Sequence, residues 1–250
     1  MIDMIGIIGG VGPLAGLDIV TKIIEETIAT TDQEHLPVLL SSQPHRIADR
    51  TAYLLGQESE NPAYAIAEII QELEKTGATV VAIPCNTAHA PRIFDVIKEE
   101  LAHAGSRVKL LHLVEETASF IQQNFGGIDV GVLSTTGTKN TGLYKNILSQ
   151  NGLETVEPDD ALQEKIHASI YDKTYGIKAI SSPVSNRARQ EIIASIMELK
   201  KLGAKAIVLG CTELPLAIPE KENSGLPVID PNRILARALI REIDPSKLHD

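Results

Sequence analysis

Residues 77–89 read GATVVAIPCNTAH and decide the fold class. Val80 to Ile83 form a short apolar run without helical periodicity, which is typical of a central parallel strand. Pro84 lacks a backbone N–H group and ends this strand, and Ala88 to Ile97 have a helix-like composition. Cys85 is therefore expected between the carboxyl end of a strand and the amino end of a helix, where open α/β sheets bind ligands. Unpaired N–H groups and the helix dipole would favour a thiolate there, whereas the alternative interpretation is a small buried hydrophobic residue.

The same pattern occurs a second time in the chain. Residues 70–87, IQELEKTGATVVAIPCNT, align without a gap with residues 196–213, IMELKKLGAKAIVLGCTE, at an offset of 126 positions. IGIIGGVGP at 5–13 similarly corresponds to VGVLSTTGT at 130–138. These repeats predict two similar open parallel-sheet domains related by a pseudo-twofold axis. Each would present one cysteine to an active site in the cleft between them.

Strand and helix patterns alternate along the rest of the chain, which predicts an α/β fold with mainly parallel sheets. The helix expected at 14–29 carries four apolar residues on one face: Leu17, Val20, Ile24 and Ile28. Residues 41–56, SSQPHRIADRTAYLLG, read as a long polar loop, and loops of this length usually carry function. Further strands are expected at 108–113, 130–133, 205–209 and 227–230, and further helices at 61–75, 115–125, 144–150, 160–171, 185–202 and 232–243.

Composition narrows the class of protein. The 250 residues are 43% hydrophobic, enough for a sizeable core, and the net charge of −10 argues against nucleic acid or an anionic membrane as a partner. The amino-terminal residues lack a basic region, and no apolar run approaches the roughly 18 residues of a membrane-spanning helix. Two cysteines are too few for a disulfide framework, and only His89 lies close enough to Cys85 to suggest a metal ligand. We therefore expect a soluble cytoplasmic protein without a metal.

Two cysteines at equivalent positions suit a racemase that works without a cofactor. Inversion of a stereocentre removes a proton from one face and returns one to the other, so two fixed bases avoid moving one base around the substrate. The ordinary pKa of cysteine, about 8.5, allows one thiol and one thiolate after modest tuning. The enzyme must also hold the substrate carboxylate and stabilise enolate-like charge. Hydroxyl and amide donors for this purpose are present in the turns at 85–87, 134–138 and 211–213.

At these residues the chain resembles the pyridoxal-phosphate-independent aspartate/glutamate racemase family, and most closely its aspartate racemase branch. The matching segments cover nearly the whole chain: IGIIGGVGPLA at 5–15, DQEHLPV at 32–38, DRTAYLLG at 49–56, PCNTAHA at 84–90, EETA at 115–118, TTGT at 135–138, GIKA at 176–179, GCTE at 210–213 and IDP at 229–231. The resemblance implies that Cys85 and Cys211 exchange protons with aspartate, or with glutamate, without a cofactor and in a homodimer. It also implies one domain of residues 1–104 with 225–250 and a second of residues 105–224.

The resemblance further implies a set of substrate-binding residues: Arg50, Asn86, Thr87, Thr135, Thr136, Thr138, Lys178 and Thr212. Arg50 resembles the family's ligand for the side-chain carboxylate, and Lys178 resembles a second cation on a mobile segment. A dicarboxylic substrate needs such cations in an otherwise acidic protein. Four more positions are expected to support the thiols: His89, Glu213, Gly10 and Gly12.

Two alternatives remain open at this point. Ala48 stands where the family commonly has proline, so the chain could be a racemase or isomerase of the same fold acting on another carboxylate substrate. In a different class, a nucleotide-binding module could use GVGPLA at 10–15, which fits G-x-G-x-x-A after a strand. Against a nucleotide, the second strand does not end in an acidic residue, and Pro13 removes an amide that phosphate would use.

Overall fold

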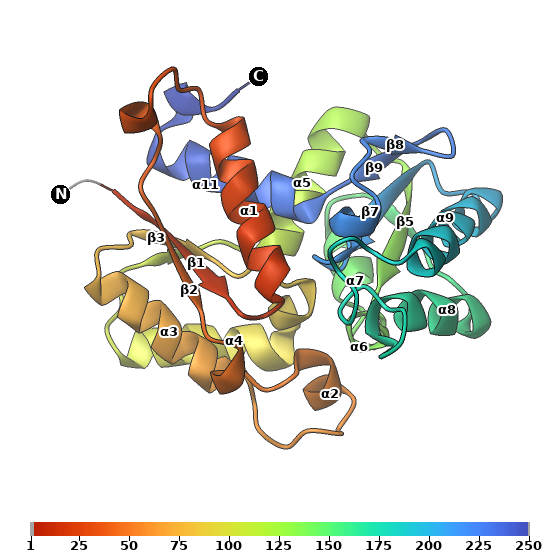
Figure 1. Ribbon diagram of the computed structural model, residues 1–250, viewed down its shortest axis with the longest axis horizontal. Coiled ribbons are helices and arrows are strands. Elements are labelled where there is room, and N and C mark those ends of the chain that lie inside the picture. The colour runs from red at the N-terminus through yellow and green to blue at the C-terminus, as the bar shows by residue number, and fades with distance from the viewer. Residues whose placement is uncertain (1–2, 250) are drawn as a thin grey trace. The chain divides into compact units, whose positions relative to one another are not determined.

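The described residues, 3–249 of a computed structural model, form two α/β units (Figure 1). Unit 1 consists of the chain up to Glu116 together with Asn232 onward, and unit 2 runs from Thr117 to Pro231. The first boundary falls inside helix α5 (Leu113–Phe125), and the second follows the first residue of α11 (Pro231–Ile243). Each unit has a sheet of its own.

The sheet of unit 1 has four parallel strands in the order β2-β1-β3-β4. They are β1 (Ile5–Gly9), β2 (Val38–Ser42), β3 (Val80–Ala82) and β4 (Lys109–Leu110). Helices α3 (Ala63–Lys75) and α4 (Pro91–His103) pack together and bury their apolar faces with Ile8 and Val81 of the sheet. Helix α1 (Pro13–Glu26) contacts β1 and β2 and lies on the other side of this sheet in Figure 1. The short helices of this unit are η1 (Asp32–Glu34), η2 (Pro44–Arg46), α2 (Arg50–Leu54), η3 (Asn86–His89) and η4 (Pro245–Lys247).

The sheet of unit 2 has the strand order β6-β5-β7-β9-β8. Its strands are β5 (Asp129–Ser134), β6 (Glu154–Val156), β7 (Ala206–Gly210), β8 (Glu222–Asn223) and β9 (Leu226–Ile229), and β8 alone among the described strands runs antiparallel to its neighbour. Helices α8 (Asp160–Tyr171) and α9 (Asn186–Lys201) bury a core with Leu133, Ile207 and Leu209. The other helices are α6 (Thr136–Asn140), α7 (Leu143–Gln150) and α10 (Leu214–Ala217). The sequence pattern does not predict α6, α10, β6 or β8, because such short segments leave little periodic signal.

The two sheets repeat one arrangement. The order β2-β1-β3-β4 corresponds to β6-β5-β7-β9. Ile5 is paired with Val80 in unit 1, and Val130 is paired with Ala206 in unit 2. These are the partners that the sequence alignment of the two copies predicts, so the expected α/β fold with two similar parallel sheets is confirmed.

A pair of glycines shows why the two copies share their sequence pattern. A Cβ atom on Gly6 would lie 2.7 Å from Cγ1 of Val81, and one on Gly131 would lie 2.8 Å from Cδ1 of Ile207. Neighbouring strand side chains therefore fill the space beside each glycine. A larger residue at either position would push the central pair of strands apart.

The unit boundaries differ from the expected division into 1–104 with 225–250 and 105–224. β4 pairs with β3, which places residues 105–116 in unit 1. β9 pairs with β7, so this strand belongs to unit 2, and the chain returns to unit 1 only with α11. A short apolar strand does not encode which sheet it joins, because any sheet edge offers it unpaired backbone groups.

Two expected elements differ in detail. Helix α1 forms, but it ends at Glu26, buries Ile19 and Ile23, and leaves Leu17 and Ile24 exposed at 53% and 51%. Ile28 lies beyond the helix and is 44% exposed. The polar stretch at 41–56 is not a plain loop, since it contains the end of β2 as well as η2 and α2. None of the helices within residues 3–249 has the length and apolar character needed to span a membrane.

Candidate functional site

Cys85 follows the central strand of unit 1, as predicted, and is 7% exposed. The residues after it form the four-residue 3-10 helix η3, and α4 begins only at Pro91. The expected continuous helix from Ala88 is therefore wrong. Ala90 is held in an extended conformation because it precedes a proline. The dipole of the long helix consequently acts on Cys85 from farther away than the sequence suggested. Asn86 and Thr87 are buried in η3 beside it.

His89 closes η3 and is fully buried. Its Nδ1 donates a hydrogen bond of 2.8 Å to the carbonyl oxygen of Cys85. Its ring stacks on Phe94 at 5.0 Å and meets the edge of His112 at 4.7 Å. Burial, and then His112, lower the pKa of His89 to about 3. The imidazole is therefore neutral near pH 7 and suited to holding the cysteine backbone in place.

Arg50 lies at the start of α2, which Asp49 caps by accepting a hydrogen bond of 2.8 Å from the amide of Ala52. Its side chain is buried, and its Nη2 donates to the carbonyl oxygen of Val11 at 2.8 Å. α2 also packs against η3. The structure thus brings Arg50, the first turn of the chain and the Cys85 segment together within unit 1.

The local structure of the first turn accounts for the glycines at positions 10 and 12. Gly10 has a φ of +79°, and a Cβ atom there would lie 2.7 Å from the backbone nitrogen of Pro44. Gly12 has a φ of +142° and precedes α1 as its N-cap residue. The close approach at Gly10 is therefore to the protein's own backbone, which accounts for this glycine without a nucleotide.

In unit 2, the Thr135–Thr138 turn caps α6 after β5. The Thr135 hydroxyl accepts a hydrogen bond of 3.2 Å from the amide of Thr138, and the two hydroxyl oxygens are 3.1 Å apart. Both residues are buried, and Thr136 is half-buried. The turn therefore presents a preorganised set of hydroxyl and amide groups.

Cys211 follows β7 of unit 2, as Cys85 follows β3 of unit 1, and is 6% exposed. Its thiol donates a hydrogen bond of 3.2 Å to Oε2 of Glu213, and Thr212 between them is buried. Oε1 of the same carboxylate accepts a hydrogen bond of 2.8 Å from Nζ of Lys178. Cys211, Glu213 and Lys178 thus form a continuous chain of thiol, carboxylate and ammonium.

Glu213 and Lys178 change the pKa of Cys211 in opposite directions. Burial raises the pKa of Cys211 well above its ordinary value, Glu213 raises it further, and Lys178 lowers it. Burial disfavours the ammonium of Lys178, but Glu213, Cys211 and Tyr171 together outweigh this effect and raise the pKa of Lys178. Cys211 is therefore a thiol near pH 7, a state suited to donating a proton.

Comparison with known proteins shows which family the chain belongs to. The Asp/Glu/hydantoin racemase family matches residues 8–239. The chain belongs to this family. A broad-specificity amino-acid racemase of Bacillus subtilis is 30% identical over 95% of this chain and 96% of its own.

Solved structures of the racemase family extend the comparison to the fold. An aspartate racemase of Picrophilus torridus has a TM-score of 0.82 and 31% identity over 99% of this chain and 96% of that one. An aspartate racemase homologue of Pyrococcus horikoshii has a TM-score of 0.73 and 26% identity over 97% and 99% of the two chains.

Helix α8 of this racemase-family chain contributes residues that the sequence analysis missed. Gln163, His167 and Tyr171 recur every four residues and so share one face of the helix. Nε2 of Gln163 donates to the carbonyl oxygen of Ser134 at 2.9 Å, and Nδ1 of His167 accepts from the amide of Thr136 at 3.3 Å. His167 stacks on Tyr171 at 4.9 Å, and Nζ of Lys178 lies 5.3 Å from the Tyr171 ring centre. The recurrence of polar and aromatic residues every four positions is the sequence signal that could have predicted this face of α8.

Tyr144 of α7 is a second omission. It is buried, and burial, followed by Cys211 and Asp230, raises the pKa of its phenol. Together with Ser134 and Thr138 it lines a cavity of about 20 Å³, enough for about one water molecule. Across residues 3–249, no cluster of three or more His, Cys, Asp or Glu side chains is placed to hold a metal ion.

Proposed function

We propose that this chain interconverts the L and D forms of an acidic amino acid, aspartate in the first place, without a cofactor. The observation that carries the proposal is the equivalent position of Cys85 and Cys211 beyond the carboxyl ends of corresponding central strands, β3 and β7. Membership of the racemase family and the likeness to an aspartate racemase support it.

In the proposed mechanism, the two cysteines act on opposite faces of one substrate. Cys211 is a thiol at rest, so the reaction begins when the Cys85 thiolate removes the α-proton and forms an S–H bond. The C–H electron pair passes into the substrate carboxylate as enolate-like charge. Cys211 then delivers its proton to the opposite face and becomes the thiolate. Each turnover takes one proton from the substrate and returns one to it, and leaves Cys85 as the thiol and Cys211 as the thiolate. The reverse reaction, or proton exchange of the two cysteines with water, restores the starting state.

The remaining polar groups would bind the substrate. We propose that Asn86, Thr87 and Thr212, beside the two thiols, hold the α-carboxylate and amino groups. Donors placed there stabilise the charge that develops in the transition state. Three residues of the second polar turn are proposed to help: Thr135, Thr136 and Thr138.

Arg50 and Lys178 are the proposed cations for the side-chain carboxylate. The Arg50 guanidinium is already oriented by the carbonyl oxygen of Val11. Lys178 is paired with Glu213, so a substrate carboxylate would have to share this ammonium with a protein carboxylate. Arg50 is therefore expected to contribute more to the preference for acidic substrates.

A second candidate function follows from the same ion pair. Glu213 compensates the charge of Lys178, and the Tyr171 ring adds a neutral face beside it. Such surroundings also suit substrates whose side chains are uncharged. A racemase of wider substrate range is therefore the alternative, and the Bacillus subtilis relative bears the description broad-specificity.

We further propose a cytoplasmic homodimer. Both cysteines are free thiols, which fits a reducing compartment. Leu17 and Ile24 are exposed on α1 at the spacing of one helix face, and Ile28, just after the helix, is exposed as well; these three residues are called the apolar stripe. A second copy of the chain would cover this stripe.

The decisive experiment is incubation with L-aspartate, L-glutamate and a panel of neutral amino acids in heavy water without pyridoxal phosphate. We expect loss of optical activity together with α-deuteration, fastest for aspartate. Cys85→Ala and Cys211→Ala should each abolish racemisation while the variants unfold at the temperature of the parent protein to within a few degrees. Full racemisation by either variant would refute the two-base assignment, and equal rates on neutral amino acids would favour the wider substrate range.

A further inference from the structure

The segment between α8 and α9, residues 172–185, carries Lys178 and folds back onto α8. The amide of Ile177 donates to the carbonyl oxygen of Ser169 at 2.9 Å, and the amide of Lys178 donates to that of Ile170 at 3.0 Å. Ile177 is fully buried. The backbone on which Lys178 stands is thus fixed to the last turn of α8.

Gly176 makes this return possible. A Cβ atom at this position would lie 2.6 Å from both the backbone nitrogen and the oxygen of Asp172. The Asp172 carboxylate also accepts hydrogen bonds from the amides of Thr174 at 2.7 Å and Tyr175 at 3.2 Å. The turn is therefore tightly defined from Asp172 to Gly176, immediately before Lys178.

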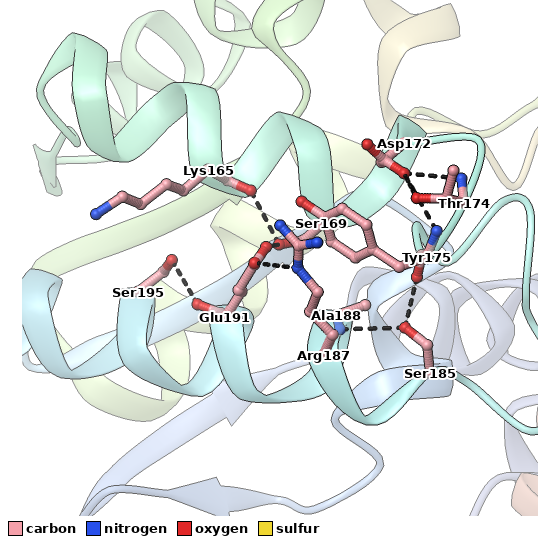
Figure 2. Close-up of polar contacts among 10 residues, drawn as sticks. All are labelled: Lys165, Ser169, Asp172, Thr174, Tyr175, Ser185, Arg187, Ala188, Glu191 and Ser195. Atoms are coloured by element: carbon pink, nitrogen blue, oxygen red, sulfur yellow. Dashed lines mark hydrogen bonds and ion pairs between the residues drawn. The ribbon is translucent and has the colours of Figure 1, made fainter.

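Glu191 of α9 joins this turn to both helices (Figure 2). Its carboxylate accepts hydrogen bonds from Oγ of Ser169 at 3.0 Å and from Nε of Arg187 at 2.9 Å. The Tyr175 phenol lies near this carboxylate, since Glu191, after burial, raises the pKa of that phenol. The Arg187 guanidinium carbon lies 3.7 Å from the centre of the Tyr175 ring, and the Ser185 hydroxyl donates to the Tyr175 carbonyl oxygen. Tyr175 is consequently held at its ring, by Arg187, and at its backbone.

Glu191 is not required to hold the two helices together. Ile166 and Ile170 of α8 and Ile192 and Ile196 of α9 are fully buried in one apolar core. Glu191 instead reaches Tyr175, three residues before Lys178, through Arg187, whose guanidinium it holds against the Tyr175 ring. A change at Glu191 should therefore act on the turn more than on the packing of the helices.

We propose that Glu191 is a positioning residue for Lys178, acting through Tyr175. This inference rests on the proposed substrate role of Lys178. Release of Tyr175 lets the turn move and carries the ammonium of Lys178 away from the place where it meets the substrate. A misplacement of about 1 Å is enough to cost roughly 100-fold in a catalytic site. We expect a smaller effect, because Ile177 remains anchored in the core.

The test compares Glu191→Gln in the parent protein and in a Lys178→Met background. Glu191→Gln should raise KM for aspartate roughly tenfold with kcat nearly unchanged, and should change KM less than about twofold when Lys178 is already Met. Glu198→Gln removes another α9 carboxylate, one paired with Lys201, and serves as the matched control with no effect. An equal KM change in both backgrounds would overturn the proposal, because Glu191 would then act without Lys178.

Amide hydrogen exchange gives a readout that needs no substrate. Glu191→Gln should speed exchange at Ile177 and Lys178 and leave the amides in the middle of α9 unchanged. Unchanged exchange at both positions would overturn the positioning role. If Lys178→Met leaves KM for aspartate unchanged, Lys178 does not bind the substrate. The exchange rates then still decide whether Glu191 positions this residue.

Discussion

Replacing Glu213 with glutamine should convert Cys211 from a thiol into a far better source of thiolate. The Glu213 carboxylate accepts the thiol hydrogen bond at 3.2 Å and repels the thiolate that would replace it. Two unit charges about 4 Å apart interact by about 4 kcal/mol at an effective dielectric constant of about 20. Water that enters when the ion pair with Lys178 is lost should reduce this to about 2 kcal/mol. That energy corresponds to a rise of roughly thirtyfold in the ratio of thiolate to thiol at a given pH.

The assay uses a Cys85→Ala background, so that Cys211 is the one cysteine in the sequence. Thiolate is followed by its ultraviolet absorbance and by the rate of alkylation as the pH is raised. In Glu213→Gln the transition should move to lower pH, because a negative charge that opposed ionisation is gone. Lys178→Met should move it to higher pH, because the opposing positive charge is gone instead.

In a protein that keeps both cysteines, the pH dependence of the racemisation rates should shift in the same direction as the thiolate transition. Glu213→Gln should lower the pH at which the rate falls in the direction that needs the Cys211 thiol. It should also lower the pH at which the rate rises in the direction that needs the thiolate. Glu198→Gln, which removes an exposed carboxylate from the same unit, is the control. An unmoved transition, or one displaced to higher pH, would refute the electrostatic reasoning.

Three further predictions concern stability, substrate affinity and assembly. Gly131→Ala should lower the free energy of unfolding by about 1 to 3 kcal/mol in urea titrations, whereas Gly127→Ala, whose new methyl group would lie 3.4 Å from its nearest neighbour, should change it much less; equal losses would contradict this account of the repeat. Asp49→Ala removes the cap of α2, so it should cost about 1 kcal/mol and raise KM for aspartate more than it lowers kcat; an unchanged KM would argue against a substrate role for Arg50. Ile24→Glu should convert a dimer into a monomer in sedimentation experiments while Tyr64→Glu, at another exposed apolar position in unit 1, should not; a dimer that survives Ile24→Glu uses another surface.

The internal repeat made the fold predictable. Two gap-free copies with glycine and cysteine at matching places led to two parallel sheets, and the observed pairing of Ile5 with Val80 and of Val130 with Ala206 follows the same alignment. Strand pairing of this kind leaves a local signature, because a central strand is buried on both faces and reads as a continuous apolar run.

The environment of Cys211 could not be predicted in the same way. The sequence placed Glu213 two residues after the cysteine and left its role open. Lys178 is 35 residues away from Glu213 in the chain, and no local pattern distinguishes it from the other lysines. The ion pair exists because the turn after α8 folds back onto that helix, which depends on Gly176, Ile177 and the contacts of Tyr175.

By itself, the sequence determined the fold class and the two cysteines at equivalent strand ends, because periodicity, glycine and cysteine placement are local properties of the chain. Only the tertiary structure decided that β9 joins the second sheet, that α1 exposes Leu17 and Ile24, and that Cys211 donates its hydrogen bond to a carboxylate held by Lys178. These features depend on which surfaces meet in space. Burial and neighbouring charge, which set the protonation of a thiol, arise only from that packing.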